Sequence, residues 1–350
     1  MNICKVKGVR LEAVAACVPE HTVYNREFAS SHFSDDLEAT LKAIGIRERH
    51  IALKEETTAI DLCVAAARRI FDSGAIRRDE IGAVIFVTMT PDCLAPNNST
   101  YVQHLLGLES NVAAYDISHA CPGYVFGLWN AALVAANMQK KVLLLDGDIN
   151  SRYVSPWDRS TALLFGDAGT ASVVSPCSGA DDWYFTFASN GAERDSIVVR
   201  IGMRYPLKRE YLEYVPDANG NRRRFIDMEM HGQEVFEYVT GEVSAITGEF
   251  LAELKLTAGG YERLYLHQAN LFMMKRLAKT LGFDRQTQMA VSLDKYGNTS
   301  SASIPLTVAA DLGRECRAAL LVGMGAGMAC AVGSISLRGL NNLGIVQLKC

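Results

Sequence analysis

Cys121 has the side chain best suited to covalent chemistry, because it lies where a strand is expected to end and a helix to begin. An apolar stretch over 112–117 leads into it, and a long stretch rich in small residues follows over 123–138. Pro122 suits a first helical turn, where no backbone donor is needed. A thiol at a helix N-terminus faces free N–H groups and the positive end of the helix dipole, which favour the thiolate. We interpret Cys121 as a nucleophile; a buried, inert cysteine is the ordinary alternative in a chain with nine cysteines.

Two further polar motifs and a glycine turn occupy comparable junctions. His267 ends the apolar run 263–266 and precedes a helical pattern, although a lone histidine there is usually structural. Asn298 follows a glycine and opens a loop before a helix, where a turn or helix-capping role is the simpler interpretation. The turn 323–327 (GMGAG) follows a strand and brings backbone N–H groups close to any ligand, but it lacks the Lys-Ser/Thr of a phosphate loop.

Strands and helices alternate in both halves of the chain. In the first half we expect helices at 58–73, 99–106 and 123–138 and strands at 83–87, 112–117 and 141–145; in the second half, helices at 234–254, 271–281 and 304–312 and strands at 263–266, 318–322 and 328–337. Continuous apolar strands alternating with helices predict an α/β protein with parallel sheets covered on both faces. The repeated order suggests a duplication, with domains at 1–176 and 177–350 divided at the Pro, Ser, Gly and Asp cluster near 175–182.

A polar insert over 204–224 interrupts the second half. Asn219-Gly220-Asn221 predicts a hairpin turn within it. The arginine run 222–224 is better explained as a solvated surface than as a docking site for an acidic partner.

Composition excludes several classes of function. The 350 residues suffice for about two domains, and the net charge of −4 gives no general attraction to nucleic acid or to an anionic membrane. The cysteines form no CxxC pair and no zinc-like cluster with histidine, so we expect no metal site. The N-terminus lacks the apolar core of a signal peptide, and no run approaches the length of a membrane span. A reduced, cytoplasmic setting fits best.

Taken together, the motifs resemble one family. The chain resembles the thiolase-fold condensing enzymes, specifically the β-ketoacyl-acyl carrier protein synthase III family. The matching segments, in order along nearly the whole chain, are 45–50 (GIRERH), the Cys121 segment 116–123, Asp158-Arg159, 165–169 (FGDAG), 230–236 (MHGQEVF), 267–270 (HQAN), 297–300 (GNTS) and the turn 323–327. The resemblance implies two duplicated βαβαβ-type halves that form a layered α/β/α/β/α sandwich.

The resemblance also implies roles for the residues. Cys121 would take the acyl group from an acyl thioester, with the backbone N–H groups of Cys121 and Ala326 as the oxyanion hole. His267 and Asn298 would bind the carbonyl of a malonyl-type thioester and stabilise the enolate formed on loss of CO₂. His267 is also a candidate base for the thiol, a task that the helix terminus would share. Decarboxylation supplies the carbanion, so we expect no metal or redox cofactor.

Departures from the family pattern concern the carriers of the substrates. Segment 38–44 lacks the tryptophan and arginine that many members place around coenzyme A, whereas Arg159 matches a residue used there and Asn270 lies in the HQAN motif. The acyl donor is therefore either a coenzyme A or a carrier protein thioester. Phe272 replaces the family's arginine for docking acyl carrier protein, and we expect a basic helix face to replace it, formed by Lys275, Arg276 and Lys279. The resemblance further implies a homodimer with residues 95–106 near its interface.

Three other functions remain open from the residues. An acyltransferase of specialised metabolism would pass the acyl group from Cys121 to oxygen or nitrogen. A papain-like hydrolase also has Cys, His and Asn in this order, but the CGSCW-type signature and a secretory segment are absent. A non-catalytic scaffold is disfavoured by the complete set of Cys121, His267 and Asn298.

Overall fold

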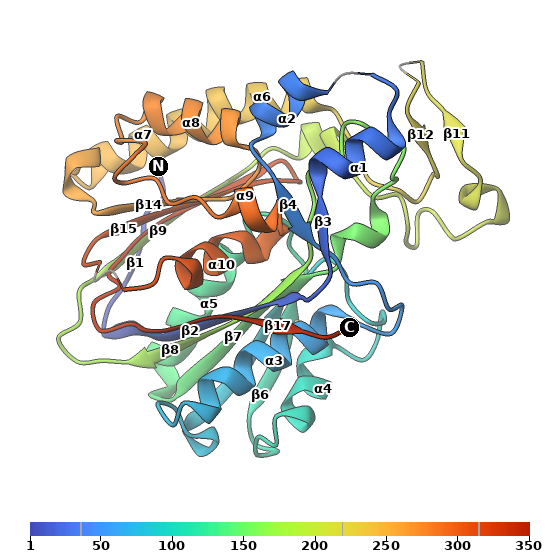
Figure 1. Cartoon of the computed structure of the whole chain (residues 1–350). Helices are drawn as coiled ribbons and strands as arrows, with labels where there is room; N and C mark the ends of the chain where they lie inside the picture. The colour runs from blue at the N-terminus through green and yellow to red at the C-terminus, as the bar shows by residue number, and fades with distance from the viewer. Residues whose placement is uncertain (36, 219, 314–315) are drawn as a thin grey trace.

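Two mixed sheets form the frame of the molecule. One layer of helices lies between the sheets, and another layer covers the outer face of each sheet (Figure 1). The computed structural model describes all residues except 36, 219, 314 and 315. The first sheet has the strand order β17-β2-β8-β7-β5-β6. Its strands are β2 (Val9–Pro19), β5 (Ile81–Val87), β6 (Ala113–Ile117), β7 (Lys141–Asp148), β8 (Ala168–Pro176) and β17 (Asn341–Leu348).

The second sheet has the order β1-β9-β16-β15-β14. Its strands are β1 (Cys4–Val6), β9 (Trp183–Ser189), β14 (Arg263–Leu266), β15 (Ala319–Gly325) and β16 (Ala329–Ile335). Strands β1 and β17 each join the sheet that is built mainly from the opposite half of the chain. The predicted division at 176 falls between β8 and β9, and as a domain boundary it stays a prediction.

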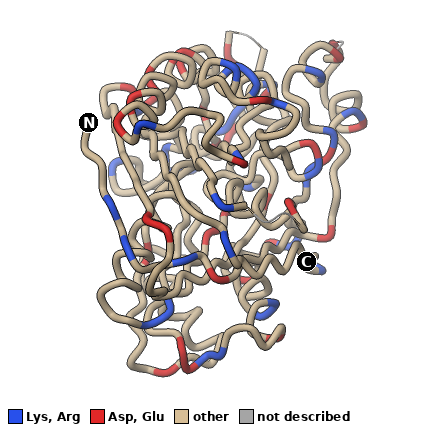
Figure 2. Tube along the Cα trace, turned by 90° about the vertical axis from the view of Figure 1, so that its left-hand side faces the viewer, with Lys and Arg blue, Asp and Glu red and all other residues tan. Residues whose placement is uncertain are grey.

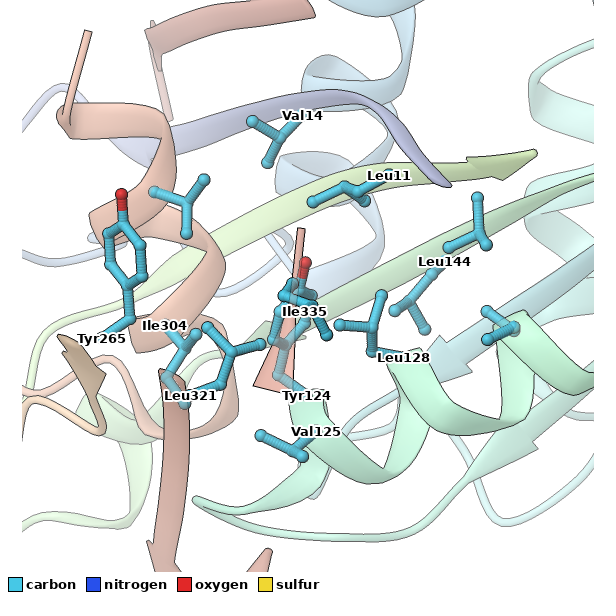
Figure 3. Close-up of a cluster of buried hydrophobic side chains, with 14 of the residues drawn as sticks. Leu11, Val14, Tyr124, Val125, Leu128, Leu144, Tyr265, Ile304, Leu321 and Ile335 are labelled. Carbon is cyan, nitrogen blue, oxygen red and sulfur yellow. The ribbon is translucent and has the colours of Figure 1, made fainter. Parts of the chain in front are cut away.

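Two apolar helices fill the space between the sheets. These are α5 (Gly123–Met138) and α10 (Ser303–Ala310). Figure 3 shows Leu128 of α5 and Ile304 of α10 among side chains from strands of both sheets, such as Leu144 and Leu321. Both helices are apolar around much of their circumference because each faces a sheet on two sides. The layered α/β/α/β/α arrangement expected from the resemblance is therefore confirmed.

The outer layers consist of amphipathic helices. α3 (Ala59–Asp72) and α4 (Asn98–Leu105) cover the first sheet, and α3 begins at a capping box formed by Thr58 and Asp61. The second sheet is covered by α6 (Gly232–Tyr238), α7 (Ser244–Glu253) and α8 (Leu271–Thr280). The helix predicted over 234–254 is thus two α-helices joined by a π-helical turn, Val239–Val243.

The remaining elements are short and surround one end of the sheets. They are β3 (Thr22–Tyr24), α1 (Asn25–His32), α2 (Glu38–Ile44), β4 (Glu48–His50), β10 (Ile197–Val198), β13 (Glu229–Met230) and α9 (Leu293–Tyr296). Among the described residues, none of the helices combines the length and hydrophobicity that crossing a bilayer requires.

The expectation of parallel sheets is only partly correct. β5 pairs in parallel with β6 and β7, and β14 with β15, but β8, β9 and β16 run antiparallel to their neighbours. β8 and β16 are buried along nearly their whole length, so no polar alternation marks them as antiparallel strands.

The polar insert contains the predicted hairpin. β11 (Val215–Pro216) pairs antiparallel with β12 (Arg222–Arg223); Asn219 of the predicted turn lies outside the described residues. The interpretation of the arginine run as a solvated surface is wrong for two of its three members. Arg223 pairs with the buried Asp158 at 3.0 Å, and Arg224 pairs with the buried Asp227 at 2.6 Å. These arginines fasten the hairpin to the body of the protein.

Candidate active site

One cavity of about 270 Å³ brings together residues that are far apart in the sequence. Cys121 at the start of α5, His267 after β14 and Asn298 after α9 all contribute to its wall, together with Ala326 of the glycine turn. The rest of the lining is mainly apolar: Met89, Ile197, Val198, Val199, Ile201, Met228, Met230, Val235, Val239, Met273 and Met324. A chamber with this lining suits an acyl chain, and a few polar groups remain to fix a thioester.

The Cys121 thiol is held against the glycine turn. The backbone N–H groups of Cys121 and Ala326 both act on its sulfur, and each lowers the pKa of the thiol. Gly325 makes this approach feasible, because a Cβ there would lie 2.8 Å from the Cys121 Sγ and 2.7 Å from its Cβ. The role of these two N–H groups as an oxyanion hole stays a prediction.

The expected stabilisation of a thiolate by the helix terminus is outweighed. Burial is the largest effect on the Cys121 thiol, and the charge of Asp148 adds to it, so its pKa rises to about 11. The N–H groups of Cys121 and Ala326 act in the opposite direction but do not overcome burial. In the free protein Cys121 is thus a thiol that must lose its proton when it reacts.

His267 is a buried, neutral donor. Burial lowers the pKa of its imidazole to about 4. Its Nδ1 lies 2.8 Å from the Ser303 hydroxyl, which also accepts the N–H of Gln268 at 3.3 Å. One lone pair of the Ser303 oxygen is occupied in this way, and a proton donated by Ser303 to Nδ1 would leave the imidazole proton on Nε2. A neutral imidazole of this kind is a hydrogen-bond donor and a weak base.

Asn298 is fixed from three sides. Its backbone N–H donates to the Leu164 carbonyl at 2.8 Å, and its own carbonyl accepts the N–H of Gly166 at 3.0 Å. Gly297 is required before it, because its φ is +69° and a Cβ would lie 2.7 Å from the Leu164 oxygen. The side-chain Oδ1 accepts the Ser300 N–H at 2.9 Å, so the amide nitrogen is the group presented to the cavity.

The other predicted site residues lie partly inside and partly outside the cavity wall, and their roles stay predictions. Asn270 lines the cavity, and its side chain also caps α8 by accepting the Met273 N–H at 2.8 Å. Arg159 does not contribute to the cavity wall; it pairs with Asp35 at 2.6 Å and stacks on Phe33 with its guanidinium 5.4 Å from the ring centroid.

The predicted docking residues form an exposed basic face on α8. Lys275, Arg276 and Lys279 are all exposed, and Phe272 beside them stacks on Phe236. Elsewhere, Figure 2 shows Lys and Arg interspersed with Asp and Glu along the trace rather than gathered into one field.

Sequence reasoning missed a polar group behind the cavity. Asp146 and Asp148 lie at the carboxyl end of strand β7 and are completely buried, and the Ser301 hydroxyl hydrogen-bonds to both. The signal was available, because two carboxylates at the carboxyl end of a buried parallel strand are unusual. Within the described residues, no group of three or more His, Cys, Asp or Glu side chains is arranged to hold a metal ion.

Comparisons of the sequence with known proteins point to one family. The family model described as 3-oxoacyl-[acyl-carrier-protein (ACP)] synthase III matches residues 115–191, and the model of its C-terminal part matches residues 251–337. The β-ketoacyl-[acyl-carrier-protein] synthase III of Symbiobacterium thermophilum is 31% identical over 339 residues, which cover 95% of this chain and 99% of that protein. The enzyme of the same name from Streptococcus suis is 32% identical over 85% of this chain and 87% of its own length.

Solved structures agree over nearly the whole chain. A 3-oxoacyl-(acyl-carrier protein) synthase from Burkholderia xenovorans superposes with a TM-score of 0.90 at 30% identity and covers 99% of both chains. The priming β-ketosynthase of the R1128 polyketide pathway has a TM-score of 0.81 at 27% identity, covering 95% of this chain and 97% of that one.

Proposed function

Because this chain belongs to the β-ketoacyl-[acyl-carrier-protein] synthase III family of acyl-transferring condensing enzymes, we propose that it joins an acyl group held on Cys121 to a malonyl-type thioester with loss of CO₂. The observation that carries this assignment is the shared cavity, whose wall includes Cys121, His267, Asn298 and Ala326.

In the first half-reaction, the Cys121 sulfur attacks the carbonyl of an acyl thioester and the donor thiol leaves. The tetrahedral oxyanion forms beside the backbone N–H groups of Cys121 and Ala326, which already favour negative charge on the sulfur. Fixed donors of this kind need no reorganisation as the charge develops. The acyl chain then occupies the methionine-rich and valine-rich part of the cavity.

In the second half-reaction, His267 and Asn298 bind the thioester carbonyl of the extender. As CO₂ leaves, negative charge moves onto that oxygen, and the two N–H donors stabilise the enolate. A neutral imidazole suits this role, since it donates a hydrogen bond without protonating the enolate carbon. The carbanion attacks the acyl-Cys121 carbonyl, which forms the new carbon–carbon bond and expels the thiolate.

This route draws its carbanion from decarboxylation, so side chains and backbone N–H groups suffice and no cofactor is invoked. The relatives reported above are all named as synthases, which favours carbon as the acceptor over oxygen or nitrogen.

We extend the proposal to the carrier protein, the cellular compartment and the oligomeric state. Acyl carrier protein is the proposed carrier of the extender, because the exposed basic face of α8 opposes the acidic surface expected of such a carrier. All nine cysteines are free, which supports a reducing, cytoplasmic compartment. We also propose a homodimer; a monomer in light scattering would contradict it.

Intact-protein mass spectrometry tests the assignment directly. The protein would be exposed to acetyl, butyryl and octanoyl thioesters on coenzyme A, on N-acetylcysteamine and on carrier protein. Wild type and the control Cys93→Ala, which removes an exposed free cysteine, should gain the acyl mass, and Cys121→Ala should not. Addition of malonyl-carrier protein should then remove that mass and release CO₂. Equal labelling of Cys121→Ala, or loss of the acyl group to an alcohol or amine without CO₂, would overturn the proposal.

A further inference from the structure

Asn150 is a polar side chain in the cavity wall that the two proposed half-reactions leave without a task. It follows strand β7 and begins the short 3₁₀ turn Asn150–Tyr153. The residue is only 5% exposed, and its amide Nδ2 is enclosed and has no hydrogen-bond partner among the described residues. An N–H group that is removed from water without an acceptor is strongly unfavourable, and native proteins keep few of them. An amide in this state, in the wall of a substrate cavity, indicates a functional constraint on the position.

The chain is fastened on both sides of Asn150, which holds the residue in the wall. Before it, the Ile149 N–H donates to the Thr90 hydroxyl at 3.0 Å. After it, the Ser151 N–H donates to Asp167 Oδ1 at 3.0 Å, and the Ser151 hydroxyl donates to Oδ2 at 2.7 Å. Asp167 is itself fully buried. The unpartnered amide is therefore built into the wall by contacts of its two neighbours.

The other two amides in the wall have partners within the protein. Asn270 Oδ1 accepts the Met273 N–H at 2.8 Å, and Asn298 Oδ1 accepts the Ser300 N–H at 2.9 Å. These bonds fix both amides and leave their nitrogens available. The Asn150 nitrogen lacks such a partner, so a group inside the cavity has to supply one.

The chemistry of a carboxamide indicates what that group is. The amide has an acceptor oxygen and two N–H donors, and a hydroxyl group can both accept from the nitrogen and donate to the oxygen. A methylene group can do neither. We place the hydroxyl on the acyl chain rather than on the carrier arm, because Asn150 follows a strand of the first sheet, whereas α8, the proposed docking face for the carrier, covers the second.

On the basis of the proposed acylation of Cys121, we propose that the Asn150 amide hydrogen-bonds to a hydroxyl group on the acyl chain and that the acyl donors of this enzyme are hydroxyacyl thioesters. The apolar part of the wall holds the methylene groups of the chain, and the amide fixes its one polar substituent. The Cys121 sulfur still attacks the acyl carbonyl and the donor thiol still leaves, and no bond to the hydroxyl oxygen breaks. Asn150 is thus a residue that determines specificity.

Acylation with matched donors tests this assignment. Hexanoyl-N-acetylcysteamine would be compared with hexanoyl thioesters that carry a single hydroxyl, on a different carbon in each, by rapid quench and mass spectrometry of Cys121. At least one hydroxylated donor should acylate wild type with a second-order rate constant about tenfold above that of hexanoyl, as for one hydrogen bond to a group otherwise left unpaired. Asn150→Leu, which replaces the amide with an apolar group of similar size, should reverse this order. Rate constants for all hydroxylated donors equal to or below that of hexanoyl in wild type would overturn the proposal.

Two more variants make the result specific to the amide. Asn150→Ala removes the amide by truncation and should also lose the preference, which keeps the test available if Asn150→Leu does not fold. Met228→Leu changes an apolar residue of the same wall, and its ratio between hydroxylated and plain donors should remain that of wild type.

The pattern of rates separates the possible failures. If Asn150→Leu slows the hydroxylated and the plain donors by the same factor, the amide acts on the carrier arm or on the fold, and the assignment to the acyl chain is wrong. Failure of wild type to form acyl-Cys121 with every donor, hexanoyl included, would instead refute the proposed function.

Discussion

Gly325→Ala should disable Cys121 by steric displacement without removing any chemical group. The added Cβ would lie 2.8 Å from the Cys121 Sγ and 2.7 Å from its Cβ. Ordinary contacts between such atoms begin near 3.5 to 4.0 Å, so one of the two segments must move by about 1 Å. The turn itself is anchored by seven residue pairs between β15 and β16, and therefore the cysteine is the group that yields.

A displacement of about 1 Å in a reacting group costs on the order of 100-fold in rate. We therefore expect acylation of Gly325→Ala to fall by about this factor, while overpacking destabilises the fold by about 1–3 kcal/mol. Acylation is measured by rapid quench with the butyryl thioester, and stability by urea unfolding. Gly248→Ala is the matched control, because nothing lies within 4 Å of a Cβ there and the position is on α7, far along the chain from the cysteine.

The two measurements together decide the outcome. A folded Gly325→Ala protein that is acylated at the wild-type rate would refute the packing of the glycine turn against the sulfur. Loss of folding in Gly325→Ala would show instead that the turn is needed for stability, and Gly325→Ser, which differs by one hydroxyl, would then be expected to fail in the same way.

Further predictions concern the remaining site residues. Asn298→Ala should still take up the acyl group but condense about 10²–10³-fold more slowly, as for loss of one oxyanion donor, and normal product formation would remove it from the enolate site. Because His267 is neutral until about pH 4 when folded but titrates near 6.5 when unfolded, the unfolding free energy should lose about 3 kcal/mol as the pH falls between these values. His267→Gln lacks this titrating group. The free energy of unfolding of wild type, measured in urea relative to that of His267→Gln, should therefore be lower at pH 4 than at pH 7. Replacing Lys275, Arg276 and Lys279 with Glu should raise KM for malonyl-carrier protein by about tenfold at low salt and leave KM for malonyl-coenzyme A unchanged.

Much of the secondary structure could be predicted because apolar runs and helical periodicity are local. The helix predicted over 123–138 corresponds to α5 (Gly123–Met138), and the strand predicted at 263–266 corresponds to β14. Strand β8 gave no such signal, because Gly, Ala and Ser dominate it. Small residues are needed there because α3 packs closely on the strand: a Cβ on Gly169 would lie 2.4 Å from the Cys63 nitrogen of α3. The need for close approach is visible only once the helix is packed on the sheet.

The site divides in the same way. Motifs identified Cys121, His267 and Asn298 because each stands at the end of a recognisable element. The charge states of these residues could not be predicted, because they depend on how deeply the folded chain buries them. For Arg159 the role in binding substrate stays a prediction; in the fold its guanidinium pairs with Asp35.

Burial suits two residues of the cavity wall to different tasks. The desolvation that keeps His267 uncharged suits it to donate a hydrogen bond to an enolate, and for the same reason makes it a poor base for the thiol. The same desolvation keeps Cys121 protonated, so its activation cannot come from a standing thiolate. Deprotonation must then be coupled to attack, and this requires an acceptor in contact with the sulfur on the side away from the acyl group.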